Sequence, residues 1–85
     1  MTESIHTPEM QSLRQWLRSE RESRCLTMRN LAASMGKPHS YIQKVEEGER
    51  RLDVVEFIWY CMALGVDPGE GIKVAMSAIS LPDSP

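Results

Sequence analysis

The chain has 85 residues, of which 41% are hydrophobic, and a formal net charge of −2. This length fits one small domain near the lower limit at which a single core suffices, so a partner subunit would help its stability. No apolar run approaches the roughly 18 residues of a membrane span, and the N-terminus lacks a basic start followed by an apolar stretch, so we expect a cytoplasmic protein.

The first predicted helix begins after Thr7, whose side chain can cap it, and has Pro8 and Glu9 in its first turn. A proline and an acidic residue both suit the start of a helix. We expect this helix to extend to about Ser23. Its predicted inward residues are Met10, Leu13 and Leu17.

Residues 26–51 indicate two short helices joined by a tight glycine turn. Thr27 can cap the first of these helices, which starts near Met28, and the side chain of Asn30 can reach back to the cap. Gly36 is predicted to end this helix, because a residue without Cβ readily adopts the left-handed conformation. The inward residues of the helix are Leu31, Ala32 and Met35.

The second short helix has Pro38 at its predicted first position, Ile42 and Val45 on its buried edge, and Gly48 at its end. Two such helices cross steeply over a shared core in a helix-turn-helix, which we place at residues 27–47. The polar residues left outside fit the major groove of DNA, which is about 12 Å wide. They are His39, Ser40, Gln43, Lys44 and Glu47. The alternative is a helical hairpin that only packs.

Asp53 and Glu56 repeat the capping pattern before a fourth helix, predicted over residues 54–64 and ended by Gly65. This helix is apolar almost all round, which is more than one face of a small domain can bury. A fifth helix is predicted to start after Asp67. Its apolar stripe has the spacing i, i+3, i+4, i+7 and consists of Ile72, Ala75, Met76 and Ile79.

The fifth-helix stripe, together with Trp59 and Met62, is predicted to form a two-fold dimer interface. A symmetric dimer pairs one patch with its copy and would present two reading helices about one DNA turn apart. Alternatively, the stripe covers the core of its own domain. A further alternative function is a protein-interaction module, such as an antitoxin or an accessory subunit, that binds a protein through the fourth and fifth helices.

The charges are unevenly distributed. Between Arg14 and Arg51 lie nine basic and five acidic residues, whereas residues 52–85 contain five acidic residues and one lysine. The basic middle would orient the reading helix toward phosphates, and the acidic end would discourage indiscriminate binding.

The cysteines and histidines do not indicate a reactive site. Cys25 and Cys61 have no spacing typical of a metal site, so we interpret them as free thiols, with a disulfide redox switch as the alternative. His6 and His39 have no suitably spaced carboxylate or cysteine partner, and no glycine-rich phosphate loop is present. The sequence therefore predicts no enzymatic activity, no metal and no cofactor.

The chain resembles the phage-repressor/Cro-type helix-turn-helix family, also called the xenobiotic-response-element (XRE) family. The resemblance covers about 60 residues, from Leu13 to Ile72. Flanking segments that also resemble the family are LDVVEF at residues 52–57 and ALGVDP at residues 63–68. The central pattern consists of Leu26, Thr27, Leu31, Ala32, Gly36, Ser40, Ile42, Val45, Glu46, Gly48 and Arg50.

The resemblance implies an all-α, five-helix lambda-repressor-like DNA-binding domain. We expect an N-terminal arm at residues 1–8, one domain at residues 9–80 and a loose C-terminal tail at residues 81–85. The implied function is a sequence-specific transcriptional regulator of double-stranded DNA. It would be a homodimer on a palindromic operator, with repression as the default outcome and activation left open.

Carried over residue by residue, the resemblance assigns base reading to His39, Ser40 and Lys44. Arg21 and Glu46 resemble a structural ion pair between the first and third helices. Residues in or beside the reading helix are candidates for phosphate contacts. These are Thr27, Lys37, Tyr41, Gln43, Arg50 and Arg51.

Three positions depart from the family pattern. His39 replaces the usual glutamine and cannot make the bidentate amide contact to adenine. Met28 stands where a glutamine often braces phosphate and the first base reader. Glu47 stands where an asparagine often meets phosphate, and its carboxylate would repel a phosphate unless a neighbouring cation compensates.

Overall fold

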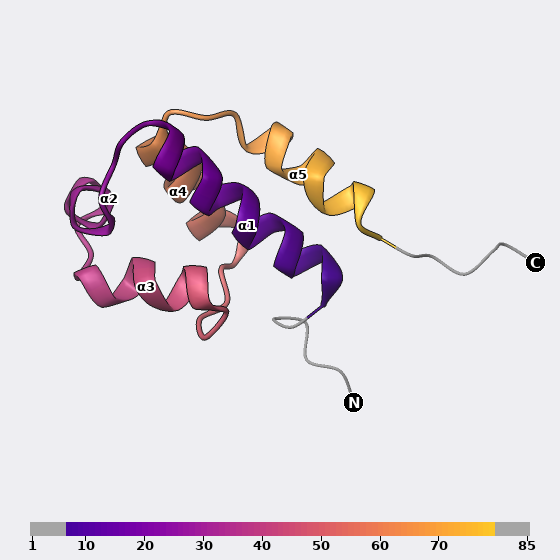
Figure 1. Cartoon of the computed structure of the whole chain (residues 1–85), viewed down its shortest axis with the longest axis horizontal. Coiled ribbons are helices and arrows are strands. Elements are labelled where there is room, and N and C mark those ends of the chain that lie inside the picture. The colour runs from indigo at the N-terminus through magenta and orange to yellow at the C-terminus, as the bar shows by residue number, and fades with distance from the viewer. Residues whose placement is uncertain (1–6, 80–85) are drawn as a thin grey trace, which may run out of the picture.

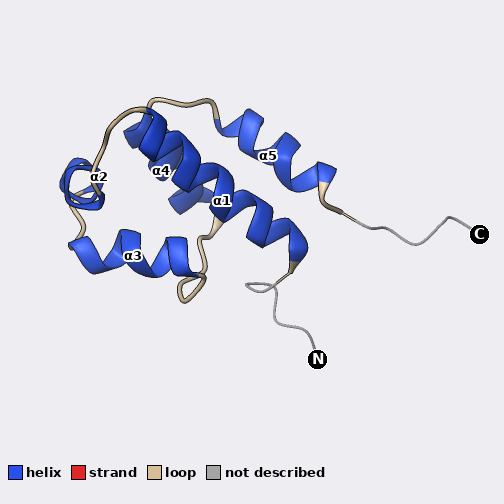
Figure 2. Ribbon diagram, viewed as in Figure 1, coloured by secondary structure: helices blue, strands red, loops and turns tan. Residues whose placement is uncertain are grey.

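The structure is a computed structural model that describes residues 7–79. Within this range the chain folds into five α-helices without a strand, which confirms the predicted all-α fold (Figure 2). The helices are α1 (Pro8–Ser23), α2 (Met28–Met35), α3 (His39–Glu47), α4 (Val54–Leu64) and α5 (Pro68–Ser77). Between residues 7 and 79, none of them is long and apolar enough to cross a membrane.

The N-terminal arm predicted at residues 1–8 overlaps α1. The Thr7 hydroxyl accepts a hydrogen bond from the Met10 N–H at 3.3 Å, and Pro8 is the first residue of the helix. Thr7 and Pro8 therefore belong to α1, because the cap and the proline start the helix. Residues 1–6 of the arm and the predicted tail at residues 81–85 lie outside the described residues.

Two helices begin with the capping boxes that the sequence predicts. Thr27 and Asn30 exchange hydrogen bonds at the start of α2, and Asp53 and Glu56 do so at the start of α4. The start of α3 differs by one residue, since Pro38 precedes the helix with an extended ψ of 156°. Pro38 is thus the cap residue and not the first helical residue.

The turn between α2 and α3 depends on Gly36, which has φ +67° and ψ +31°. Its N–H donates to the Ala33 carbonyl at 3.1 Å, and the Lys37 N–H donates to the Ala32 carbonyl at 2.9 Å. These bonds satisfy carbonyls that the end of a helix leaves without partners. Figure 1 shows the result, with α2 seen nearly end-on and α3 lying across the view, so that the two helices cross steeply.

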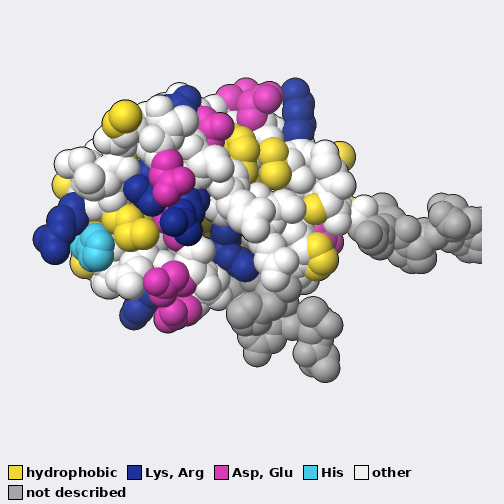
Figure 3. All heavy atoms as spheres, viewed as in Figure 1, with side chains coloured by type: hydrophobic (Ala, Val, Ile, Leu, Met, Phe, Trp, Pro, Cys, Tyr) yellow, Lys and Arg dark blue, Asp and Glu magenta, His cyan; other side chains and the backbone are white. Residues whose placement is uncertain are grey.

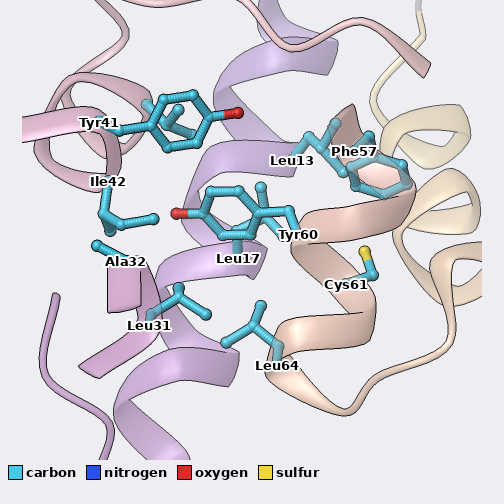
Figure 4. Packing of buried hydrophobic residues seen from close by; sticks show 11 residues of the cluster. Leu13, Leu17, Leu31, Ala32, Tyr41, Ile42, Phe57, Tyr60, Cys61 and Leu64 are labelled. Atoms are coloured by element: carbon cyan, nitrogen blue, oxygen red, sulfur yellow. The ribbon is translucent and has the colours of Figure 1, made fainter. Parts of the chain in front are cut away.

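The hydrophobic core lies between α1, α2, α3 and α4, and Tyr60 is fully buried within it (Figure 4). The Tyr60 and Tyr41 rings lie close together in the close-up, with their hydroxyls pointing in opposite directions. The core residues are Leu13, Leu17, Leu31, Ala32, Tyr41, Ile42, Val45, Phe57, Tyr60, Cys61 and Leu64.

The two cysteines have different environments, although both are free thiols. Cys25 is exposed directly after α1 and has a positive φ of 57°. Cys61 is buried in the core, and this burial raises the pKa of its thiol to about 11. A buried, protonated thiol is a poor nucleophile, so Cys61 has the character of a core residue.

Both α4 and α5 carry large hydrophobic side chains that are exposed. Four residues of α4 are buried, while large hydrophobic side chains on its other side are exposed. On α5, Ile72 and Met76 are 49% and 64% exposed, so this stripe is only partly covered by its own domain. Ile79 lies beyond the end of α5, because Ala78 caps the helix. The exposed hydrophobic residues are Val54, Val55, Ile58, Trp59, Met62, Ile72, Met76 and Ile79.

The stripe faces outward because α5 approaches the core through a glycine. Gly71 is the buried residue of α5, and a Cβ at this position would lie 2.7 Å from both Phe57 Cζ and Trp16 Cζ3. Such a distance is shorter than carbon atoms tolerate. The close packing of α5 on α1 and α4 therefore requires the absence of a side chain at residue 71.

We predict that Gly71→Ala destabilises the fold by about 1–3 kcal/mol, because the added methyl group forces two aromatic rings apart. Denaturant unfolding followed by circular dichroism would measure this change. Gly69→Ala is the matched control on the same helix, since the nearest neighbour of its Cβ would be the Asp67 carboxylate, at 3.3 Å. Equal unfolding midpoints for the two variants would show that α5 does not depend on this approach.

Candidate nucleic-acid interface

The outer face of α3 is polar and accessible. Ser40, Gln43, Lys44 and Glu47 are exposed, and His39 is half-buried at the start of the helix. Their spacing places all five on one side of α3, opposite the buried residues Ile42 and Val45. The predicted base-reading residues His39, Ser40 and Lys44 therefore share one face.

Lys44 is the exposed cation on this face, and the ion pairs found between residues 7 and 79 do not include it. Gln43 differs, because its amide Nε2 donates to the Glu47 carboxylate at 3.2 Å. This bond partly occupies the side chain predicted for a phosphate contact. It also gives the Glu47 carboxylate an amide donor on the same exposed face.

His39 lies beside the start of α2. Its side chain lines a shallow hollow together with Thr27, Met28 and Arg29. Figure 3 shows the one described histidine among basic and apolar side chains at the end of the molecule where α2 meets α3. The Thr27 hydroxyl already caps α2, accepting from the Asn30 N–H at 3.0 Å.

Arg29 is a basic residue outside the set of predicted phosphate contacts. It is exposed in the first turn of α2, on the same hollow as His39. Its sequence signal is a cation two residues after the cap Thr27, where the helix start already attracts anions. Arg29 is therefore a further candidate for a phosphate contact.

Tyr41 does not occupy the exposed position that a direct phosphate contact requires. The side chain is only 6% exposed, and its hydroxyl oxygen is buried. Burial also raises the pKa of Tyr41. The prediction that Tyr41 contacts phosphate directly is therefore wrong, because its hydroxyl has no access to a phosphate.

The Tyr41 ring contacts two of the other predicted phosphate ligands. Lys37 Nζ lies 5.3 Å from the ring centroid, and Arg50 Cζ lies 4.8 Å from it. Arg50 also donates from Nη2 to the Glu56 carboxylate at 2.7 Å. Arg51, the next residue, is exposed. Cations thus flank both ends of α3.

The Arg21–Glu46 ion pair fixes α3 against α1. Arg21 donates to the two carboxylate oxygens of Glu46 from Nε at 2.6 Å and from Nη2 at 3.1 Å. Its Nη1 donates to the Leu26 carbonyl at 2.8 Å, just before α2. The Glu46 side chain is 2% exposed, and its hydrogen bond to Arg21 raises the pKa of the guanidinium. Arg21 and Glu46 therefore join α1 to α3, and Arg21 also lines the hollow beside His39.

Comparison with known proteins agrees with this geometry. The family model described as Helix-turn-helix matches residues 17–70. The chain belongs to the XRE-type helix-turn-helix family. No curated protein matches it.

Three solved structures show the same arrangement. An XRE-family like protein from Pseudomonas syringae pv. tomato str. DC3000 is 36% identical, with a TM-score of 0.79 over 87% of this chain and 90% of that one. The restriction-modification controller protein C.AhdI from Aeromonas hydrophila is 32% identical, with a TM-score of 0.66 over 71% of this chain and 91% of that one. The clp gene regulator ClgR from C. glutamicum is 25% identical, with a TM-score of 0.73 over 85% of this chain and 94% of that one.

We predict that Arg21→Ala lowers the free energy of unfolding by about 3–5 kcal/mol, because it leaves the Glu46 carboxylate buried without its cation. Arg18→Ala is the matched control. It removes an exposed ion pair with Glu22 from the same helix and should change stability by no more than about 0.5 kcal/mol. Chemical denaturation would measure both. An Arg21→Ala protein as stable as the control would contradict the structural role of the pair.

Proposed function

We propose that the protein is a sequence-specific transcriptional regulator that represses as a homodimer on a palindromic double-stranded DNA operator. The coarser function, a DNA-binding transcription regulator, follows from the family and its regulator neighbours. Repression is the expected outcome, because a protein bound to an operator that overlaps a promoter blocks polymerase.

The observation that carries this proposal is the exposed polar face of α3. His39, Ser40 and Lys44 share that face and offer imidazole, hydroxyl and ammonium groups. Lys44 can donate to guanine O6 and N7 in the major groove, and Ser40 can donate or accept. We assign base reading to these three residues and phosphate binding to basic residues around them. The phosphate candidates are Arg29, Lys37, Arg50 and Arg51.

Two predicted phosphate contacts have restricted donors. The Gln43 amide bonds to Glu47, and the Thr27 hydroxyl caps α2. Each can still meet a phosphate through a remaining donor, since an amide carries two N–H groups and the start of α2 presents backbone N–H groups. We therefore keep both as supporting contacts beside the basic residues.

The exposed apolar surface of α4 and α5 supports the homodimer. Trp59 and Met62 are 54% and 69% exposed, and the α5 residues Ile72 and Met76 add to the same kind of surface. A small soluble domain rarely leaves so many large hydrophobic side chains in water unless they form an interface. We propose a two-fold contact there, including the half-buried Ala75 and the exposed Ile79.

The same apolar surface would also suit a protein-interaction module, in which the occupant is a different protein. The oligomeric state of the isolated protein distinguishes the two functions. We further propose that the protein acts in the cytoplasm and has no enzymatic activity, in line with the regulators of its family.

We predict that selection from random duplexes yields a motif, and that Lys44→Ala and His39→Ala each relax the preference at particular bases by about 1–3 kcal/mol. Arg51→Ala should instead weaken all sequences alike, because phosphates carry no sequence information. Lys73→Ala is the matched lysine control, since Lys73 is exposed on α5 and paired with Glu70. Binding to the selected duplexes can be followed by fluorescence anisotropy.

If no motif emerges from the selection, the specific-regulator proposal is wrong. If a motif emerges but Lys44→Ala and Lys73→Ala behave alike, α3 is not the base reader.

We predict that the 9.7 kDa chain sediments as a dimer and that Met62→Glu produces monomers, because a carboxylate would be buried without a partner in the interface. Gln15→Glu adds the same charge to the exposed surface of α1 and should leave the dimer intact. Analytical ultracentrifugation measures both. A monomeric wild-type chain that forms a stoichiometric complex with another protein would support the interaction module instead.

A further inference from the structure

Arg50 is held by two side chains that come from different helices. It lies in the connection between α3 and α4, and its guanidinium bonds to Glu56 at 2.7 Å while its Cζ lies 4.8 Å from the centroid of the Tyr41 ring. The same ring has Lys37 Nζ at 5.3 Å. One aromatic ring of α3 therefore contacts a cation that precedes the helix and another that follows it.

We propose that Tyr41 and Glu56 are positioning residues that hold Lys37 and Arg50 ready for DNA phosphates. This inference rests on the proposed DNA-binding function and extends it. Neither Tyr41 nor Glu56 needs to touch the DNA in this arrangement.

The physical reason is the freedom that long basic side chains lose on binding. Lysine and arginine sample many rotamers in water, and ordering them opposes association. A cation placed over an aromatic ring before binding has already lost part of that freedom. Lys37 and Arg50 would therefore bind phosphate more tightly than the same side chains on a bare surface.

The geometry leaves Arg50 able to bind. Its side chain is 42% exposed, and its bond to Glu56 uses the Nη2 end of a planar group that carries five N–H donors. The ring contact restrains the flat guanidinium, while hydrogen bonds to a phosphate form at its edge. The restraint and the phosphate thus use different parts of Arg50.

Glu56 is itself fixed by the start of α4. One carboxylate oxygen accepts from the Asp53 N–H at 3.0 Å, as part of the capping box, and the other accepts from Arg50. The Glu56 side chain is only 17% exposed. A single carboxylate therefore caps the start of α4 and orients Arg50.

The ring of Tyr41 contacts both cations, whereas its hydroxyl acts on only one of them. The hydroxyl is buried, and its interaction with Arg50 raises the pKa of the guanidinium. Phenylalanine keeps the ring and leucine keeps only the apolar volume. This difference provides a matched pair of variants.

We expect Tyr41→Leu to bind duplex DNA about two- to fivefold more weakly than the wild type, and Tyr41→Phe, which keeps both ring contacts, to bind it more tightly than Tyr41→Leu. In a double-mutant cycle, the loss caused by Tyr41→Leu should shrink when Arg50 is already Ala, because the ring then has one fewer cation to hold. A purely structural effect of Tyr41→Leu would be the same in both backgrounds. Affinities would be measured by anisotropy at fixed salt, below the unfolding temperature of every variant.

A second measurement needs no DNA. Side-chain ¹⁵N relaxation of the Arg50 Nε should show an ordered group in the wild type and in Tyr41→Phe, and a mobile one in Tyr41→Leu and Glu56→Gln. Glu56→Gln keeps an oxygen that can cap α4 while it removes the charge that holds Arg50. Equal mobility of Arg50 in all four proteins would overturn the proposal.

The outcomes separate this inference from the function on which it rests. A wild-type protein that binds no duplex would remove the DNA-binding function, and with it the purpose assigned to the held cations. A wild-type protein that binds DNA, with Tyr41→Leu and Tyr41→Phe equal in affinity, would overturn the positioning role alone.

Discussion

The Arg21–Glu46 ion pair is the contact on which the rest of the structure depends. It joins α1 to α3 through two hydrogen bonds and joins α1 to the segment before α2 through the Leu26 carbonyl. A buried carboxylate and guanidinium tolerate little displacement, because separating them leaves two poorly solvated charges without their partners. The orientation of α3 relative to the scaffold is thus set by directional bonds as well as by the apolar contacts of Ile42 and Val45.

Features encoded by neighbouring residues could be predicted from the sequence. The capping boxes of Thr27 with Asn30 and Asp53 with Glu56 are local, and so is the left-handed turn at Gly36. The Arg21–Glu46 pair spans 25 residues, and it was expected only through the family resemblance. Local rules predict the helices, whereas the family resemblance predicts this contact between α1 and α3.

Features that depend on packing were missed. Tyr41 lies four residues before Val45, a spacing that places it on the buried side of α3, whereas its predicted phosphate contact came from its place in the reading helix. The Arg50–Glu56 bond crosses the connection between α3 and α4 with a separation of six residues, outside any helical spacing. Ile79 fits the apolar period but follows a helix end that no glycine or proline marks. The role of Gly71 could not be predicted either, because a glycine within a helix does not indicate that the Phe57 and Trp16 rings pack against it.

The division of α4 into a buried side and an exposed apolar side has a consequence for evolution. Phe57, Tyr60, Cys61 and Leu64 are held by the core, and if the outer residues contact a second copy, they are held by the interface. Such a helix has hardly any position at which change is neutral. If α4 forms the proposed contact and α3 reads DNA as proposed, relatives should diverge more slowly in α4 than on the exposed side of α1, and a lineage could acquire a new operator by altering α3 while its subunits still recognise one another.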